Sequence, residues 1–204
     1  NIKVLISSNI KINDLYKDGL QREQFIPFIR IISMFCEEHE LIINHDYRKS
    51  GISKLERFFY PISSQTSFQA NSIFREISKG KINKPKKIVI KGRDFIIQNF
   101  FEGLARFDFN DLCGLSIGAE DYIKIANFCN FILIDNVPNF GDENEDRQQR
   151  FITLIDILYE KKIPIMLTAN FNYKNFKSSR RLINPYKRTI SRLFELASPK
   201  FKVD

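Results

Sequence analysis

The sequence has no tryptophan and contains only two histidines and three cysteines among its 204 residues. The two histidines, His39 and His45, flank a short apolar stretch six positions apart, a pattern that disfavours a metal site. Cys36, Cys113 and Cys129 show no C-x-x-C spacing. They are therefore interpreted as free thiols, buried among apolar residues, in a reducing compartment.

Long hydrophobic runs are lacking as well. No run of about 18 apolar residues occurs, so a membrane-spanning helix is not expected, and no signal peptide is visible. Hydrophobic residues still make up 43% of the chain and charged residues 27%, so a packed core under a charged surface is expected.

An initiator methionine is also missing. The chain begins at Asn1, and residues 2–6 already read as a strand, Ile-Lys-Val-Leu-Ile. A domain rarely opens inside a buried strand. The sequence is therefore expected to be a fragment, a processed product or a truncated reading frame.

The motif G-x-x-x-x-G-K-[ST], which forms a phosphate-binding loop between a strand and a helix, does not occur. The nearest match is Gly80-Lys81, but Ile82 follows it and Arg75 stands where the first glycine should be. No Walker A motif is therefore present in these residues.

The sequence contains the apolar strand and the aspartate of a Walker B motif but lacks the glutamate that follows them. Residues 131–134 are apolar and end at Asp135, but Asn136 replaces the glutamate that would polarise a water molecule. Asp135 is interpreted as a capping residue at the end of a buried strand. No spacing suggests a Ser/His/Asp or Cys/His pair, so the chain alone shows no self-sufficient catalytic centre.

Apolar periodicity predicts an α/β fold with a middle region rich in β-hairpins. Helix is disfavoured before a proline, so the first helix is expected to begin at Pro27. Gly92 and Gly103 are predicted turn points. The predicted strands cover residues 2–8, 41–44, 87–90, 95–97, 105–109, 131–134 and 163–167. The other predicted helices lie in residues 68–78, 119–129, 151–158 and 190–197.

The net charge is +8, and one stretch concentrates the positive charge. Two interpretations of this basic run stay open: the solvated rim of a hairpin, or a patch for nucleic acid or an acidic partner. Aromatic interleaving is limited to Phe95 at the edge of the run, so no base-stacking platform is indicated. The run consists of Lys79, Lys81, Lys84, Lys86, Lys87, Lys91 and Arg93.

A series of short motifs extends over nearly the whole chain. In the first part of the chain they are Ser7-Ser8-Asn9, Asp14–Arg22 and Phe25–Ile29. In the second part they are Asp46-Tyr47-Arg48, Asp121-Tyr122, Asp135–Pro138, Arg150–Ile152, Leu154–Asp156, Tyr159-Glu160, Arg188–Leu193 and Glu195. Together these motifs resemble the ZapE family of AAA+ P-loop ATPases, which includes the bacterial cell-division ATPase and its mitochondrial relative, the lactation-elevated protein.

The resemblance implies two nucleotide-sensing positions in the first part. Asn9 matches sensor 1, where an asparagine can hydrogen-bond a γ-phosphate or the attacking water; the alternative is a turn residue at a strand end. Arg22 matches an arginine finger, which offers its planar guanidinium across a subunit boundary. The alternative for Arg22 is a surface ion pair with Asp18 or Glu23. Gln24 departs from the arginine often found there.

Near the end of the chain, the resemblance implies that Arg192 or Arg188 makes a sensor-2-like contact with nucleotide. The two residues are one turn apart on the helix face opposite the apolar stripe. The alternative for Arg192 is an ion pair with Glu195.

As a whole, the resemblance implies the C-terminal portion of an AAA+ ATPase. Residues 1–45 would be the remnant of the nucleotide-binding α/β domain, and residues 46–204 a family-specific α/β region. The full-length family uses ATP and Mg; this chain alone is expected to bind neither and to be inactive. Expected partners are further copies of the chain or the missing N-terminal half, and a cell-division ring protein. A cytoplasmic location is expected, with a mitochondrial one as the alternative. The rival hypothesis is a non-enzymatic, basic nucleic-acid-binding module.

Overall fold

The computed structural model describes residues 8, 10–17, 19, 21–39, 57–114, 117–172 and 174–199. The chain divides into two units, residues 1–45 and 46–204. Asn9 and the strand predicted at residues 41–44 lie outside the described residues, as does the strand predicted at residues 2–8 except for Ser8. The assignment of the first unit to a nucleotide-binding domain therefore stays a prediction.

The first unit contains a short 3-10 helix, η1 (Ile12–Asp14), and the helix α1 (Arg22–Phe35). The predicted start at Pro27 is wrong, because the helix begins five residues earlier and carries Pro27 inside it. Pro27 lacks one amide donor, so it removes a single backbone bond and the remaining bonds hold the helix. Among the apolar side chains of α1, Ile29 is buried, whereas Phe28 and Phe35 are exposed.

The second unit is built on a five-stranded sheet in the order β1-β7-β6-β5-β4. Its strands are β1 (Phe58–Phe59), β4 (Asn99–Phe101), β5 (Leu104–Asp108), β6 (Phe131–Val137) and β7 (Ile165–Ala169). Only β4 runs antiparallel to its neighbour; the other pairings are parallel. Helices connect the parallel strands, so the predicted α/β class is confirmed. The short strands β1 and β4 were not predicted.

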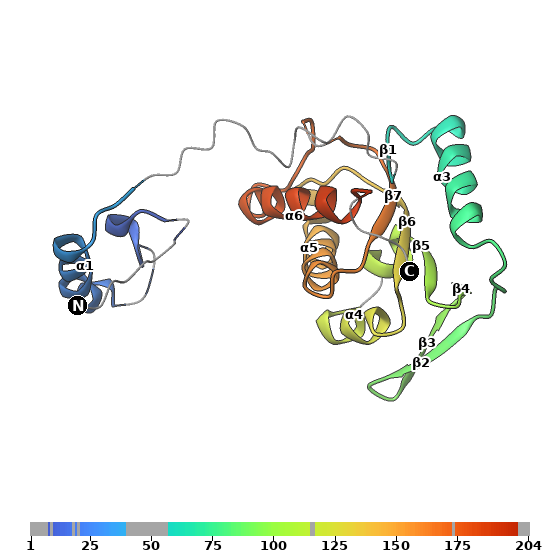
Figure 1. Ribbon diagram of the computed structural model, residues 1–204, viewed down its shortest axis with the longest axis horizontal. Helices are drawn as coiled ribbons and strands as arrows, with labels where there is room; N and C mark the ends of the chain where they lie inside the picture. Colours follow the sequence, from blue (N-terminus) through green and yellow to red (C-terminus); the bar gives the residue numbers. More distant parts are fainter. Residues whose placement is uncertain are drawn as a thin grey trace. The chain divides into compact units, whose positions relative to one another are not determined.

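Helices cover both faces of this sheet (Figure 1). On one face lie α4 (Ala119–Ala126), α5 (Glu145–Glu160) and α6 (Ile183–Leu196), and on the other lies α3 (Ser64–Ile77). Side chains alternate along a strand, so Ile132 and Ile134 join the larger core under α4–α6. Phe131 and Leu133 point the other way and pack with Phe74 of α3.

A second, two-stranded sheet consists of β2 (Lys86–Ile90) and β3 (Arg93–Ile97). The strands meet at Lys91-Gly92, both with positive φ, as a tight hairpin turn requires. Gly103, with φ +97, turns the chain between β4 and β5. The predicted turns at Gly92 and Gly103 are thus confirmed.

The described residues of the second unit also form two short turns: η3 (Asn110–Gly114), a π-helical turn after β5, and η4 (Asp142–Asn144), which leads into α5. Acidic residues open α5, as expected from the interaction of carboxylates with a helix N-terminus. None of the helices in the described parts of the chain is long and apolar enough to cross a membrane.

Candidate functional site

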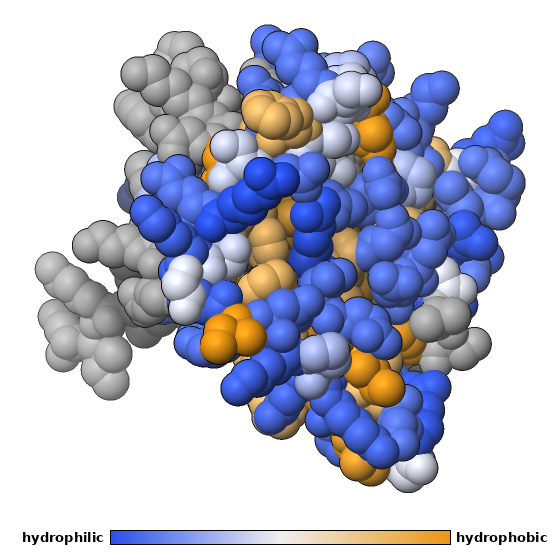
Figure 2. Space-filling model, turned by 90° about the vertical axis from the view of Figure 1, so that its right-hand side faces the viewer, coloured by the Kyte–Doolittle hydropathy of each residue, from blue (hydrophilic) through white to orange (hydrophobic). Residues whose placement is uncertain are grey.

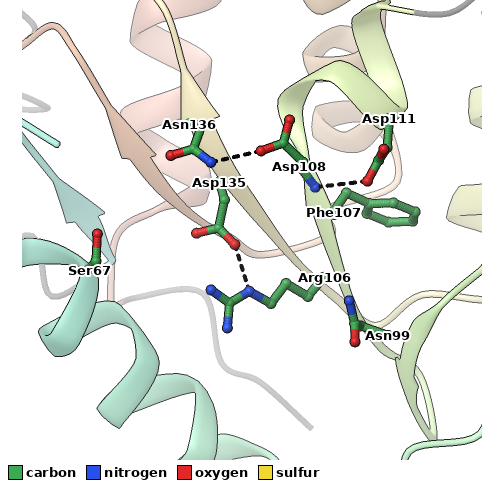
Figure 3. A pocket seen from close by; sticks show the side chains of 8 residues that line it. All are labelled: Ser67, Asn99, Arg106, Phe107, Asp108, Asp111, Asp135 and Asn136. Carbon is green, nitrogen blue, oxygen red and sulfur yellow. Dashed lines mark hydrogen bonds and ion pairs between the residues drawn. The ribbon is translucent and has the colours of Figure 1, made fainter. Parts of the chain in front are cut away.

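A polar pocket lies at the carboxyl ends of β5 and β6, the edge of a parallel sheet where α/β proteins bind their ligands. Its volume is about 290 Å³. Asp108 and Asp135 are direct neighbours in the strand register, which brings two carboxylates to this edge. The residues that line the pocket are Ser67, Asn99, Arg106, Phe107, Asp108, Asp111, Asp135 and Asn136 (Figure 3).

The side of the pocket formed by β5 and β6 holds an ion pair between Arg106 and Asp135. Arg106 Nε donates to Asp135 Oδ2 at 2.6 Å, and both side chains are more than two-thirds buried. The guanidinium also lies 5.8 Å from the ring centre of Phe74. The interpretation of Asp135 as a capping residue is therefore wrong: it lies within β6 and neutralises a cation on the neighbouring strand.

Asn136 joins β6 to the end of β5 and to β7. Its backbone adopts the left-handed conformation, with φ +62, which asparagine tolerates better than most residues. Its side-chain amide donates to Asp108 Oδ2 at 2.7 Å, and its backbone amide donates to Thr168 Oγ1 at 2.9 Å. Asn136 thus performs a structural role at the position where a Walker B motif would place glutamate.

Asp108 and Asp111 hold the turn η3 in place. Asp108 Oδ1 accepts hydrogen bonds from the backbone and side-chain nitrogens of Asn110, and the Asp108 amide donates to Asp111 Oδ2 at 3.2 Å. Arg106, Asp108 and Asp111 were not predicted from the sequence as candidate site residues. The available signal was a pair of charged residues two positions apart in the otherwise apolar segment 104–108.

The pocket does not fit Mg-ATP. No P-loop is present in the sequence to hold the phosphates, and Asp135, the carboxylate that follows the Walker-B-like apolar run, is already paired with Arg106. Among the described residues there is also no group of three or more His, Cys, Asp or Glu that could hold a metal ion.

Arg192, a predicted nucleotide contact, joins α6 to α5. Its Nη1 donates to Asp156 Oδ1 at 2.5 Å, and its guanidinium lies 4.9 Å from the ring centre of Tyr159. Arg188 approaches the other oxygen of Asp156 at 3.5 Å. Glu195, the alternative partner predicted for Arg192, instead accepts a hydrogen bond from the Tyr159 hydroxyl at 2.9 Å.

Arg22, the predicted arginine finger, is the first residue of α1. Its Nη2 donates to the carbonyl oxygen of Asn13 at 2.9 Å, whereas its Nε is buried without a hydrogen-bond partner among the described residues. Arg22 therefore tethers α1 to η1. The structure brings Arg188 and Arg192 together, while Arg22 belongs to the other unit.

Asp121 forms another ion pair in the larger unit. Its Oδ1 accepts from Arg93 Nη2 at 2.6 Å, and its Oδ2 accepts from the Gly118 amide at 2.8 Å. Burial alone would raise the pKa of the Asp121 carboxyl, but the hydrogen bond from Gly118 and the charge of Arg93 outweigh burial and hold that pKa below its usual value. The Asp121 carboxylate thus connects the hairpin to α4.

The cysteines are free, as predicted. Cys113 and Cys129 are buried, and burial raises the pKa of each thiol to about 12, so neither has the thiolate character of a reactive cysteine. Cys36 is only half-buried, which corrects the prediction of burial for all three.

The basic run carries less available charge than its sequence suggests. Three of its seven cations are paired: Lys87 with Asp94, Lys91 with Glu120, and Arg93 with Asp121. A nucleic-acid surface depends on cations that are available to phosphates. The pairing therefore favours the interpretation of this segment as the rim of a hairpin.

Comparison with known proteins matches residues 1–203 to the model of the AFG1-like ATPase family. The chain is 31% identical over 173 residues to lactation elevated protein 1 homolog B of Danio rerio, a match that covers 83% of the chain and 34% of that relative. It is 25% identical over 200 residues to cell division protein ZapE of Escherichia coli K12, with 98% and 53% coverage. No solved structure matches. The chain thus spans between about a third and a half of the length of these relatives. Because the family model matches nearly the whole chain, the chain belongs to the AFG1-like ATPase family.

Proposed function

We propose that this chain is the C-terminal portion of an ATPase and that the phosphates of ATP are held by a P-loop outside these 204 residues. The observation that carries the proposal is the family match over residues 1–203 in a sequence without G-x-x-x-x-G-K-[ST]. The Arg106–Asp135 pair supports it, because Asp135, which follows the Walker-B-like apolar run, is already neutralised.

In this proposal the residues of the first unit assist hydrolysis at a nucleotide bound elsewhere. Asn9 acts as sensor 1, and Arg22 is presented to the ATP of a neighbouring subunit in an oligomer. A sensor role for Arg192 is less well supported, because its guanidinium already contacts Asp156 and Tyr159 and is not free to contact nucleotide. Its role in holding α6 against α5 is sufficient to account for these contacts.

The role of the ATPase is proposed by analogy with its relatives. The name of the Escherichia coli relative indicates cell division, so a protein of the division ring is the proposed partner if the source is bacterial. A cytoplasmic location then follows, and a mitochondrial one is the alternative.

The test uses the 204-residue chain alone. Isothermal titration with Mg-ATP and a phosphate-release assay should show no tight binding and no turnover, because no P-loop amides or lysine hold the phosphates. Low-micromolar affinity accompanied by turnover would overturn the proposal. As a control for folding, amide NMR dispersion must show that the chain is structured under the conditions of the assay.

A further inference from the structure

The pocket at the carboxyl ends of β5 and β6 contains polar groups that make no hydrogen bonds to the described residues of the protein. Arg106 bonds Asp135 through Nε, and no partner of its two terminal nitrogens is found among the described residues. Figure 3 shows these nitrogens on the side of the pocket where Ser67 lies. A guanidinium fixed at one edge and open along the other is arranged to bind a carboxylate with two parallel hydrogen bonds.

Two further hydrogen-bond donors line the same pocket. The Ser67 hydroxyl on α3 and the Asn99 side-chain amide on β4 make no hydrogen bond to other described residues. In Figure 3 these two residues lie on opposite sides of Arg106. The pocket therefore offers uncharged donors beside its one cation.

The other end of the pocket is acidic. Asp111 is exposed and uses only Oδ2 in a hydrogen bond, and Asp108 Oδ2 accepts a single hydrogen bond from Asn136. The Arg106–Asp135 pair is neutral, so Asp108 and Asp111 leave the pocket with an excess of negative charge. Such a site repels polyanions such as nucleotides but attracts an ammonium group.

The Arg106 end and the acidic end of the pocket together indicate the charge of the ligand. A simple anion would be repelled by the two carboxylates that no cation neutralises, and a simple cation would be repelled by the guanidinium. A molecule with a carboxylate at one end and an ammonium group at the other satisfies both. We propose that the pocket binds a small zwitterion of the α-amino-acid class, with its carboxylate on Arg106 and Ser67 and its ammonium group beside Asp108 and Asp111.

The size and surroundings of the pocket fit a small polar ligand. Its volume of about 290 Å³ is at the lower end for ligand pockets. The side of the molecule seen in Figure 2, toward α3, is mainly hydrophilic, and its hydrophobic residues form separate spots. The residues that line the pocket are polar or charged except Phe107, so polar contacts are the main source of affinity there. The proposal does not depend on the ATPase assignment.

The experiment is an NMR chemical-shift titration of the full 204-residue chain with glycine, L-serine, L-aspartate and L-lysine. Acetate and methylammonium serve as probes that carry only one of the two charges. We expect saturable shifts at Ser67, Arg106 and Asp111 with at least one amino acid, and at least ~10-fold weaker binding of both single-charge probes. This ratio corresponds to about 1.4 kcal/mol. Equal binding of acetate, or no saturable shift with any amino acid, would overturn the proposal.

Variants locate the site. Arg106→Met should abolish binding, but it also leaves Asp135 without its partner and risks the fold. Ser67→Ala and Asp111→Asn remove one half-exposed and one exposed group and preserve the ion pair; each should weaken binding about 3- to 10-fold. Asp94→Asn, on the hairpin outside the pocket, is the matched control and should leave affinity unchanged. Unchanged affinity in both Ser67→Ala and Asp111→Asn would exclude this pocket.

Discussion

Arg192 on α6 and Asp156 on α5 form a hydrogen-bonded ion pair at 2.5 Å, with both side chains about three-quarters buried. Tyr159 lies under the guanidinium and bonds Glu195 through its hydroxyl, so two adjacent turns of α5 are joined to α6. All four residues belong to motifs that resemble the ATPase family. In this structure those motif residues hold two helices together.

Replacement of Arg192 should therefore destabilise the fold. Arg192→Ala is expected to lower the free energy of unfolding by about 1–2 kcal/mol, because a partly buried carboxylate loses a charged hydrogen bond. Arg188→Ala is the control: its contact with Asp156 is longer and the side chain is mostly exposed, so its loss should cost about 0–0.5 kcal/mol. Urea denaturation gives both values. Equal losses in the two variants would contradict the importance of the Arg192 contact.

Tyr186 and Tyr122 provide a matched pair of buried hydroxyls. Both side chains are fully buried, but Tyr122 donates to the Leu112 carbonyl at 2.8 Å, whereas the Tyr186 hydroxyl has no partner among the described residues. Burial raises the pKa of both phenols, so both are neutral at physiological pH.

The two Tyr→Phe variants should accordingly differ in sign. Tyr186→Phe removes an unsatisfied buried hydroxyl and should leave the free energy of unfolding unchanged or raise it by up to ~1 kcal/mol. Tyr122→Phe leaves the Leu112 carbonyl without its donor and should lower it by about 1–2 kcal/mol. Thermal and urea unfolding test both variants. A clear loss of stability in Tyr186→Phe would show that its hydroxyl has a partner, such as a buried water.

The elements that were predicted well are those with long apolar patterns. The strand β7 is buried throughout, β6 is buried over residues 131–134, and α5 buries one face, so their apolar patterns are visible in the sequence. The strands β1 and β4 are two and three residues long, too short to show any period, and they exist because a longer neighbour pairs with them. The start of α1 was missed because a local proline rule was applied to a residue that the helix tolerates.

The pocket was not predictable from sequence for a different reason. Arg106 and Asp135 are 29 positions apart and meet only because β5 and β6 are parallel neighbours in one register. Ser67 lines the same pocket from α3, a helix that precedes both strands in the sequence. A charged residue in an apolar strand indicates that a partner exists, but the partner is determined by strand order.

The Asp121–Arg93 pair predicts an acid-dependent loss of stability. The pKa of Asp121 is lower in the folded state than the value of about 3.9 expected when unfolded. The stabilisation is therefore complete above that value and is lost as pH falls through the folded-state pKa. At neutral pH, Asp121→Asn should cost about 1–2 kcal/mol, and its difference from the parent should shrink below about pH 4.

Urea unfolding at several pH values measures this effect. Asp94→Asn is the control, because its pair with Lys87 is half-exposed and should contribute about 0–1 kcal/mol. A difference between Asp121→Asn and the parent chain that stays constant from neutral to acidic pH would contradict the assignment.

Arg22 allows a structural and a catalytic role to be separated. Its bond to the Asn13 carbonyl is a local tether between η1 and α1, and the loss of that bond should cost about 1 kcal/mol. If Arg22 is also a finger acting on a neighbouring subunit, Arg22→Ala in the complete ATPase should reduce turnover by ~10³-fold, or about 4 kcal/mol of transition-state stabilisation. Nucleotide affinity should change little. Arg30→Ala, an exposed arginine on the same helix, is the matched control and should retain normal turnover.

Subunit mixing then distinguishes a finger that acts in trans from a general defect. Arg22→Ala subunits are combined with subunits that cannot bind nucleotide, each inactive alone. A trans finger predicts partial recovery, because at some boundaries an intact Arg22 faces an intact nucleotide site. A tether alone predicts no recovery, since an unstable subunit is not repaired by its neighbour. Near-normal turnover of Arg22→Ala by itself, with only the small loss of stability, would remove Arg22 from the catalytic residues and leave the bond to Asn13 as its function.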